Sequence, residues 1–378
     1  MNNRIKTIII AIITVIVSIL IINFFTKDRE GVISGTITVV TDKYTNEYLS
    51  ELAENYMNGH SRTKINIELI DNIKDLDNKF KEGKKDNLPN IAILNSYELD
   101  YLKNKYKLNF ENEEDLLNIY KRNFTKSSLQ QITIDGKEMG IPLTTNPLVL
   151  YLREDILKQY GYKSSDINTW DGFIEVSKNI YKKSNGKYKG LSTIDDDYEN
   201  LIKVLIMQNI DYFNNKEEVI KSVKKDYKNL EDNKILAREG DDFFAIISSI
   251  NTMKTLKGLR RKCEWTVNDI PAYKIGSNRF YVADGYSSFV INNDKKNREL
   301  INSFSEYMIT NTDIALEYAL NGDLFPTYIY AYNNKEIEKS MNNFIGKSPL
   351  VVMSNISKKA PKIKNYNLYK EVKKELLK

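Results

Sequence analysis

The chain contains few of the side chains that most often carry out catalysis. Among its 378 residues there is one cysteine, Cys263, and one histidine, His60. A disulfide framework or a cysteine-rich zinc site needs several cysteines, and a catalytic triad or histidine-rich metal site would have to be built around His60. His60 follows a predicted helix in the segment YMNGHSR, where an exposed loop residue is the simpler interpretation. The sequence therefore predicts no metal site and no cofactor.

Carboxylates are abundant, but they form no recognisable catalytic set. The chain has 51 Asp and Glu residues, enough to include a pair of carboxylates that cleaves a glycosidic bond, but their spacing in the sequence identifies no such pair. The densest acidic run is TIDDDYENL at 193–201. Adjacent aspartate side chains diverge, and the run lacks the spacing and the glycine of a calcium-binding loop. A solvated loop that caps a helix over 199–209 explains the run without a metal. An enzyme therefore ranks behind the binding functions considered below.

Composition indicates a globular protein with a solvated surface. The chain is 41% hydrophobic and 28% charged, and its length suits two domains with proper cores. The 56 Lys and Arg residues alternate with the 51 Asp and Glu residues along the sequence. This mixture is not the concentrated basic patch of a nucleic-acid-binding surface, so no nucleic-acid partner is expected.

The N-terminus predicts a membrane anchor. Residues 7–26 are twenty consecutive uncharged residues, long enough to cross a bilayer as a helix. Arg4 and Lys6 precede this run, whereas the KDRE segment after it is charge-balanced, so the N-terminus should stay in the cytoplasm. A cleaved signal peptide would need a shorter apolar core and small residues before the cut. We expect residues 1–30 to be a cytoplasmic stub and signal anchor of a single-pass cell-membrane protein, with the bulk of the chain extracytoplasmic.

Strands and helices alternate through the first half of the remaining chain. Strands are expected over 35–42, 64–70 and 90–95, separated by helices over 45–58 and 73–84. This alternation is typical of a parallel sheet covered by helices. The second half repeats the alternation. Strands are expected over 148–152, 189–193 and 241–249, with a strand pair over 280–291. Helices are expected over 153–160, 199–209, 215–230 and 296–320, and the segment 333–378 is expected to be helical and basic.

One segment of the chain carries two prolines beside a strongly apolar strand. Pro142 and Pro147 precede the predicted strand 148–152, which is apolar enough to be buried on both faces. Each proline removes a hydrogen-bond donor from a sheet ladder. The pattern is explained if the chain passes from one sheet to another between 142 and 147.

Six segments together resemble a known family. KEMGIPLTTNPLVLYLREDILKQYGY, NTWDGFIEVSKNIYKK, AREGDDFFAIISS, EWTVNDIPAY, ADGYSSFVINNDKKNRELINSFSEYMI and GDLFPTYIYAYNN follow one another as in extracellular solute-binding proteins of family 1, the sugar-type receptors of ATP-driven importers. The resemblance covers roughly residues 36–335. The chain departs from the family pattern because it has no lipid-anchoring cysteine, and because Tyr286 stands where relatives often have tryptophan. Only two tryptophans occur at all.

The resemblance implies the α/β, two-lobed periplasmic-binding-protein-like fold of type II, here with an N-terminal transmembrane helix. Lobe 1 would comprise residues 35–143 and 284–325, and lobe 2 would comprise residues 146–282 and 328–378. The chain would cross between the lobes three times and bind its ligand in the cleft between them. Closure of the two lobes around the ligand is the expected motion.

In sheets of this kind, ligands collect where loops leave the carboxyl ends of strands. Two residues of the acidic run at 193–201 are added to the candidates, because the resemblance implies that this loop faces the cleft. The resulting ligand-binding candidates are Asp42, Tyr44, Asn95, Ser96, Thr144, Thr145, Asn146, Asp197, Tyr198, Ser248, Ser249, Asp284 and Tyr286.

These candidates predict a neutral, hydroxyl-rich ligand. Apart from Lys43, no lysine or arginine cluster lies among them, so a phosphate or multiply acidic ligand would lack partners. A mono- or oligosaccharide fits better: Tyr286 would stack on a sugar ring while Asp284 and Asp42 accept hydrogen bonds from its hydroxyls. The alternative is that Asp284 and Tyr286 only shape the crossing.

The function expected from the resemblance is a membrane-anchored extracellular receptor that delivers a small solute to the permease subunits of an ABC importer. A sensory or scaffold ectodomain with the same fold, which signals to a membrane partner without transport, is the second possibility. Both need the same cleft, so the residues themselves do not separate them.

Overall fold

The structure is a computed structural model that describes residues 33–81, 88–106, 110, 113–292 and 294–377. The predicted membrane helix at 7–26 lies outside these residues. Within them, no helix is both long and apolar enough to cross a bilayer.

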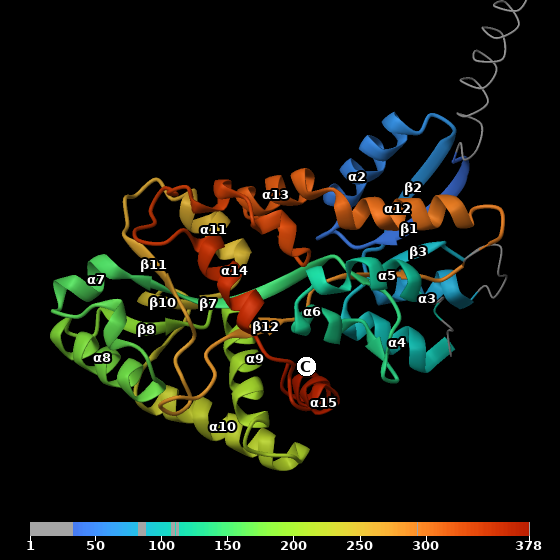
Figure 1. Cartoon of the computed structure of the whole chain (residues 1–378). Coiled ribbons are helices and arrows are strands. Elements are labelled where there is room, and N and C mark those ends of the chain that lie inside the picture. Colours follow the sequence, from blue (N-terminus) through green and yellow to red (C-terminus); the bar gives the residue numbers. More distant parts are fainter. Residues whose placement is uncertain (1–32, 82–87, 107–109, 111–112, 293, 378) are drawn as a thin grey trace, which may run out of the picture.

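Two sheets, each covered by helices, form two lobes that lie side by side (Figure 1). The first sheet has five strands in the order β2-β1-β3-β13-β6. β1 pairs in parallel with β2 and β3, whereas β13 is antiparallel to both β3 and β6. The sequence alternation therefore predicted the parallel part of this sheet correctly. Its strands are β1 (Gly35–Thr41), β2 (Thr63–Leu69), β3 (Ile91–Leu94), β6 (Ile141–Pro142) and β13 (Ser287–Val290).

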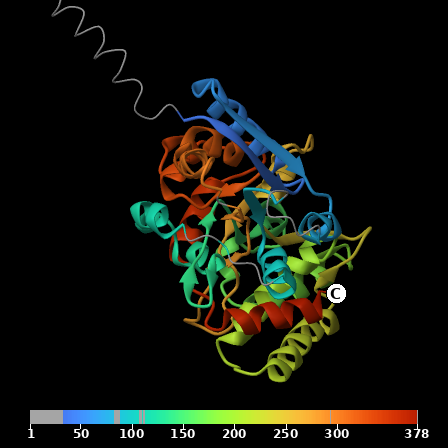
Figure 2. The same cartoon turned by 90° about the vertical axis from the view of Figure 1, so that its right-hand side faces the viewer.

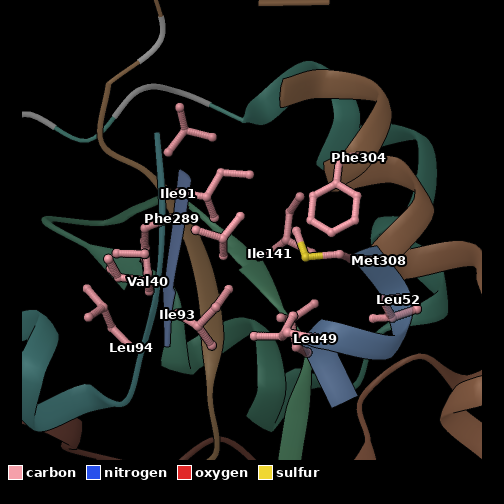
Figure 3. Packing of buried hydrophobic residues seen from close by; sticks show 14 of the residues in the cluster. Val40, Leu49, Leu52, Ile91, Ile93, Leu94, Ile141, Phe289, Phe304 and Met308 are labelled. Carbon is pink, nitrogen blue, oxygen red and sulfur yellow. The ribbon is translucent and has the colours of Figure 1, made fainter. Parts of the chain in front are cut away.

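The core of lobe 1 is built on both faces of this short sheet. On one face Ile91 and Ile93 point toward Leu49, Phe304 and Met308 from two covering helices (Figure 3). Alternation along the strand turns Leu94 to the opposite face. The helices of this lobe are α2 (Asn46–Gly59), α3 (Ile73–Lys81), α4 (Ser96–Tyr106), α5 (Glu114–Tyr120), α6 (Lys126–Gln131) and α12 (Arg298–Thr310), and a hairpin of β4 (Thr133–Ile134) and β5 (Lys137–Glu138) follows α6.

The second sheet has seven strands built around β7. Its main path is β11-β7-β10-β8-β9, and β12 and β14 also pair with β7. Alternate residues of β7 face different helices: Leu148, Leu150 and Leu152 belong to one hydrophobic cluster, and Val149 and Tyr151 to another. The strand is thus buried on both faces, as its apolar run predicted. The strands are β7 (Thr144–Arg153), β8 (Tyr188–Ser192), β9 (Leu236–Ala237), β10 (Asp242–Ser248), β11 (Trp265–Asn268), β12 (Tyr281–Ala283) and β14 (Phe325–Pro326).

Helices cover both faces of this second sheet. α8, α9, α10 and α15 contribute to the cluster with Leu150, whereas α11 and α14 contribute to the cluster with Tyr151. α13 bridges the lobes, because Ile314 packs in the core of lobe 1 and Ala319 in the cluster with Tyr151. The bounds are α7 (Glu154–Gln159), α8 (Trp170–Lys183), α9 (Asp196–Ile210), α10 (Lys216–Asp232), α11 (Ile250–Lys257), α13 (Thr312–Asn321), α14 (Pro349–Lys359) and α15 (Tyr366–Leu376).

Three chain segments join the sheets, and they are hydrogen-bonded to one another. The first half of β7 pairs with β14 at residues 144–145 and with β12 at residues 146–148, both antiparallel. The Thr327 amide donates to the Leu143 carbonyl at 3.0 Å. The chain leaves the first sheet after Pro142 and enters the second at Thr144, so the predicted change of sheets is found. Pro147 lies inside β7, opposite Val282, and does not mark the change.

Two predicted elements differ from the structure. The single helix expected over 296–320 is two helices, because Asn311 interrupts it and accepts a hydrogen bond from the Ile314 amide as the N-cap of α13. The segment 333–378 was expected to be helical, but within its described residues only α14, α15 and one short 3₁₀ turn, Lys335–Glu338, are helical.

A close backbone approach at the second crossing gives a first prediction. A Cβ atom added at Gly285 would lie 2.1 Å from the Thr144 carbonyl oxygen. Gly285→Ala should therefore lower the free energy of unfolding by about 2 kcal/mol or more, measured by urea denaturation. Gly59→Ala is the matched control, because a Cβ there meets nothing within 4 Å, and it should change stability by less than about 1 kcal/mol. Equal destabilisation by both variants would contradict the tight crossing.

Candidate functional site

A cleft of about 2070 Å³ lies between the two lobes. Its lobe 1 wall is formed after β1 and β3, and its lobe 2 wall is formed by the loop before α9 and the start of α11. The crossing segments form its base. The cleft therefore lies where strands end, as the fold class predicts.

Most of the predicted site residues line this cleft, and three do not. Asp42 is withdrawn into the turn before α2, Thr145 is a buried residue of β7 with 1% exposure, and the ring of Tyr198 packs edge-on against Tyr227 at a centroid distance of 5.7 Å. The structure brings the other ten together: Tyr44, Asn95, Ser96, Thr144, Asn146, Asp197, Ser248, Ser249, Asp284 and Tyr286.

Asp42 holds the turn that presents Tyr44 to the cleft. Its carboxylate accepts hydrogen bonds from the amides of Tyr44 at 2.9 Å and Thr45 at 3.2 Å. The Tyr286 hydroxyl also donates to this carboxylate. Burial, and then the negative charge of Asp42, raise the pKa of Tyr286 well above its ordinary value. Tyr286 is therefore a neutral donor whose hydroxyl is already used within the protein.

Two tyrosine rings on the lobe 1 wall remain exposed. Tyr44 is 62% exposed and Tyr97 is 52% exposed, and both line the cleft. The Tyr44 ring lies 6.4 Å from the Tyr286 ring at an interplanar angle of 30°. Large exposed aromatic rings beside a cleft are typical of a ligand-stacking surface.

Asp284 lies at the second crossing, and its carboxylate has partners from two parts of the chain, α4 and α15. Its carboxylate accepts hydrogen bonds from Tyr366 at 2.6 Å and Ser96 at 2.9 Å, and it pairs with the Lys373 ammonium at 2.5 Å. Burial raises the pKa of Asp284, but the charge of Lys373 and these hydrogen bonds outweigh it, so the pKa lies below its ordinary value. The carboxylate is ionised at neutral pH, and both of its oxygens have partners within the chain.

The start of α4 is a reciprocal capping box. The Asn95 side chain accepts from the Glu98 amide at 3.1 Å, and the Glu98 carboxylate accepts from the Asn95 amide at 2.9 Å. Burial, opposed by that hydrogen bond and aided by the nearby charge of Asp42, raises the pKa of Glu98 to about 7.

The lobe 2 wall carries hydroxyl, amide and carboxylate groups. Asp197 accepts a hydrogen bond from Ser192 at 2.5 Å, and burial, with Asp196 and Asp195 adding, raises the pKa of Asp197 to about 6. The Thr252 hydroxyl bonds to Ser248 at 2.8 Å. Within the described residues, the buried hydroxyl of Ser249 has no hydrogen-bond partner. No group of three or more potential metal ligands occurs in the described part of the chain.

Lysines gather at the candidate site, so the prediction that no lysine cluster lies there was wrong. The loop after α14 and the helix α15 bring lysines from the end of the chain to the cleft, where short-range sequence reasoning could not place them. Leu368 and Val372 lie on the buried face of α15, so their spacing did signal an amphipathic helix, but it did not identify the surface against which the helix packs. The lysines that line the cleft are Lys103, Lys105, Lys203, Lys362, Lys364, Lys370, Lys373 and Lys374.

Other cleft residues were also missed by the sequence analysis. Tyr97 follows Ser96 directly and could have been found by extending the rule for strand ends by one residue. Asn200 and Thr252 lie within α9 and α11, so only the orientation of each helix brings them to the cleft.

Comparison with known proteins identifies the family. The pattern of bacterial extracellular solute-binding proteins matches residues 51–344, and the chain belongs to this family. The resemblance seen in the six sequence segments is thereby confirmed.

Curated relatives match over part of their length. A lactose-binding protein of Rhizobium radiobacter is 27% identical over 176 residues, which cover 45% of this chain and 40% of that protein. An arabinooligosaccharide-binding protein of Halalkalibacterium halodurans is 25% identical over 91 residues, covering 24% of this chain and 20% of the relative. The matched stretches therefore span well under two thirds of these relatives.

Solved structures share the fold over nearly the whole chain. The sugar-binding protein MalE of Xanthomonas citri has a TM-score of 0.68 at 12% identity, over 90% of this chain and 96% of that structure. The cyclic alpha-maltosyl-1,6-maltose binding protein of Arthrobacter globiformis has a TM-score of 0.67 at 15% identity, over 91% and 94%. This likeness shows the two-lobed α/β fold that was expected.

The raised pKa of Glu98 predicts a pH-dependent stability. Because the folded-state pKa of about 7 exceeds the ordinary 4.5, its contribution to stability is present below the ordinary pKa and is lost as the pH rises through about 7. Glu98→Gln keeps an oxygen acceptor for the Asn95 amide but cannot ionise. Between pH 5 and pH 8 the unsubstituted protein loses the contribution of Glu98, whereas the variant has no such loss. The unfolding free energy of the variant minus that of the unsubstituted protein should therefore rise by about 1–2 kcal/mol over this interval. Urea denaturation at both pH values measures it.

The exposed Glu54 on α2 provides the control for this measurement. Glu54→Gln should show the same pH dependence as the unsubstituted protein. A Glu98→Gln variant that follows the same curve as Glu54→Gln would contradict the raised pKa.

Proposed function

We propose that this chain is an extracellular receptor that binds a carbohydrate in the cleft between its lobes and delivers it to the permease of an ABC importer. Membership in the solute-binding family supports a binding role, and curated relatives include proteins named for lactose and arabinooligosaccharide binding. The observation that carries the choice of carbohydrate is the pair of exposed rings, Tyr44 and Tyr97, beside a cleft lined with hydroxyl and amide groups.

The chemistry of this wall suits a sugar. A pyranose presents an apolar C–H face that stacks on an aromatic ring, and its edge carries hydroxyls that need hydrogen-bond partners. On the opposite wall, Asn251 and Thr252 present an amide and a hydroxyl at the start of α11, next to Ser249, whose buried hydroxyl has no partner among the described residues. Desolvating such groups is costly unless a ligand satisfies them, which favours a polar ligand over an apolar one.

The roles expected from the sequence are changed at three positions, Asp42, Asp284 and Tyr286. The carboxylates of Asp42 and Asp284 are occupied by groups of the protein, so we assign them to shaping the cleft. We assign stacking on the sugar ring to Tyr44 and Tyr97, and the Tyr286 ring contacts and supports the Tyr44 ring. The proposed ligand contacts are Tyr44, Asn95, Ser96, Tyr97, Thr144, Asn146, Asp197, Ser248 and Ser249.

The proposal extends to domain boundaries and anchoring. We assign residues 35–143 and 284–325 to lobe 1 and residues 146–282 and 328–378 to lobe 2. The hydrophobic clusters support this division except at three places: α13 joins two clusters, Phe325 packs in the cluster with Tyr151, and Ala331 packs in the core of lobe 1. The apolar run at 7–26 would hold the receptor on the outer face of the cell membrane, next to its permease.

A ligand screen with ring variants tests the carbohydrate proposal. The full chain in detergent is screened by thermal shift against neutral oligosaccharides, acidic sugars, peptides and polyamines, and the best sugar is then titrated calorimetrically. Tyr97→Ala and Tyr44→Ala should each weaken binding by about tenfold, because each removes a stacking face worth roughly 1–1.5 kcal/mol.

The matched control is Tyr330→Ala. Tyr330 is 57% exposed but does not line the cleft, so its removal should leave the affinity unchanged. A peptide or polyamine as the sole ligand, or equal affinity losses in all three variants, would overturn the carbohydrate proposal.

A further inference from the structure

The C-terminal helix α15 belongs to lobe 2 but lies in the space between the lobes (Figures 1 and 2). Its apolar face, with Leu368, Tyr369 and Val372, is buried in the same cluster as α9 and α10. Lys216 of α10 also pairs with Glu375 of α15 at 2.6 Å. These contacts fasten the helix to one lobe.

The opposite face of the same segment is attached to lobe 1. The Lys370 ammonium contacts both carboxylate oxygens of Asp100 on α4, at 2.9 and 2.7 Å. Just before the helix, the Ile363 amide donates to the Gln130 side chain at 2.8 Å, and the Gln130 amide group donates back to the Ile363 carbonyl at 2.9 Å. Two separate points of lobe 1, on α4 and α6, are thus held by a segment of lobe 2.

The Asp284 cluster adds a third attachment, close to the axis of any lobe rotation. Ser96 comes from lobe 1, Asp284 from the second crossing, and Tyr366 and Lys373 from α15. The Asp284 and Lys373 side chains are only 12% and 20% exposed. Separating a charge pair that is this shielded from water leaves each partner poorly compensated, so the cluster resists opening more than an exposed pair would.

We propose that residues 361–377 form a strap that holds the two lobes in the arrangement seen here and restricts access of ligand to the cleft. Opening by rotation about the crossings requires the Lys370–Asp100 pair and the Gln130–Ile363 pair to separate. Asn365, Tyr366 and Lys370 of this segment also line the cleft, so the strap forms a third wall beside the two lobes. Release of the strap and admission of ligand are therefore coupled.

The part of this proposal that concerns ligand rests on the proposed function, whereas the part that concerns the lobe distance does not. The experiment therefore has two readouts. Spin labels at Glu54→Cys on α2 and Lys228→Cys on α10, in the full chain with Cys263→Ser, report the distance between the lobes by pulsed electron resonance. Stopped-flow mixing with lactose, the sugar in the name of one curated relative, reports the association rate.

Charge reversal isolates the strap. Asp100→Lys and Lys370→Asp should each shift the distance distribution toward longer values and raise the lactose association rate about threefold or more, because they increase the open population. The double variant Asp100→Lys/Lys370→Asp restores an opposite-charge pair and should return both readouts toward those of the unsubstituted protein. Lys216→Gln, which breaks a pair between α10 and α15 within lobe 2, is the matched control and should change neither.

The outcomes separate the two proposals. Unchanged distance distributions in both single variants would overturn the strap. The same shift in the Lys216→Gln variant would also overturn it, because the effect would then come from general loosening of α15. Changed distances without lactose binding in any variant would count against lactose as the ligand, and the strap would stand.

Discussion

The pairing of three crossing segments along the first half of β7 is the constraint on which the rest of the molecule depends. β14 and β12 bond to β7 at adjacent positions, so every passage between the sheets runs through one narrow ribbon. Gly285 lets the second passage approach Thr144 more closely than any side chain would permit. Because the ribbon is narrow and its strands are paired, it suits the hinge of the proposed receptor, about which the two lobes would rotate as units.

The crossing also decides where charge is buried. Asp284 ends the second passage at the base of the cleft, where a carboxylate needs compensation for lost hydration. A lysine and a tyrosine from α15 and a serine from α4 supply it. The same contacts that stabilise Asp284 therefore join the C-terminal helix, the hinge and lobe 1. This makes the end of the chain part of the cleft.

The two walls of the cleft differ in character. The lobe 1 wall presents exposed tyrosine rings on turns held by Asp42 and Asn95, so stacking surfaces are rigidly supported. The lobe 2 wall presents hydroxyls, amides and the carboxyl group of Asp197, whose pKa burial raises to about 6. In the proposed receptor, this division would let one lobe bind the face of a flat polar ligand while the other satisfies its edge, and closure would complete the hydrogen bonds.

The sequence by itself determined the local architecture. The alternation of strands and helices, the change of sheets after Pro142 and the strand ends that carry Tyr44, Asn95 and Ser248 all follow from short-range patterns, because period and turn chemistry are local properties. The interruption of the helix at Asn311 could not be predicted as readily, since a capping asparagine and an exposed helical asparagine look alike in sequence. Ten of the thirteen predicted site residues line the cleft, nine of them selected by the rule for strand ends and Asp197 by the family resemblance.

Only the tertiary structure decided which of those residues are free to meet a ligand. Asp284 lies 89 positions before its partner Lys373, and no sequence pattern in either segment predicts this contact. Tyr198 turns toward Tyr227 because α10 packs beside α9, which its own neighbours in sequence do not reveal. Contacts of this kind depend on the relative placement of whole helices. That placement is set by the burial of apolar surface from the entire chain, so it becomes visible only once all the elements are assembled.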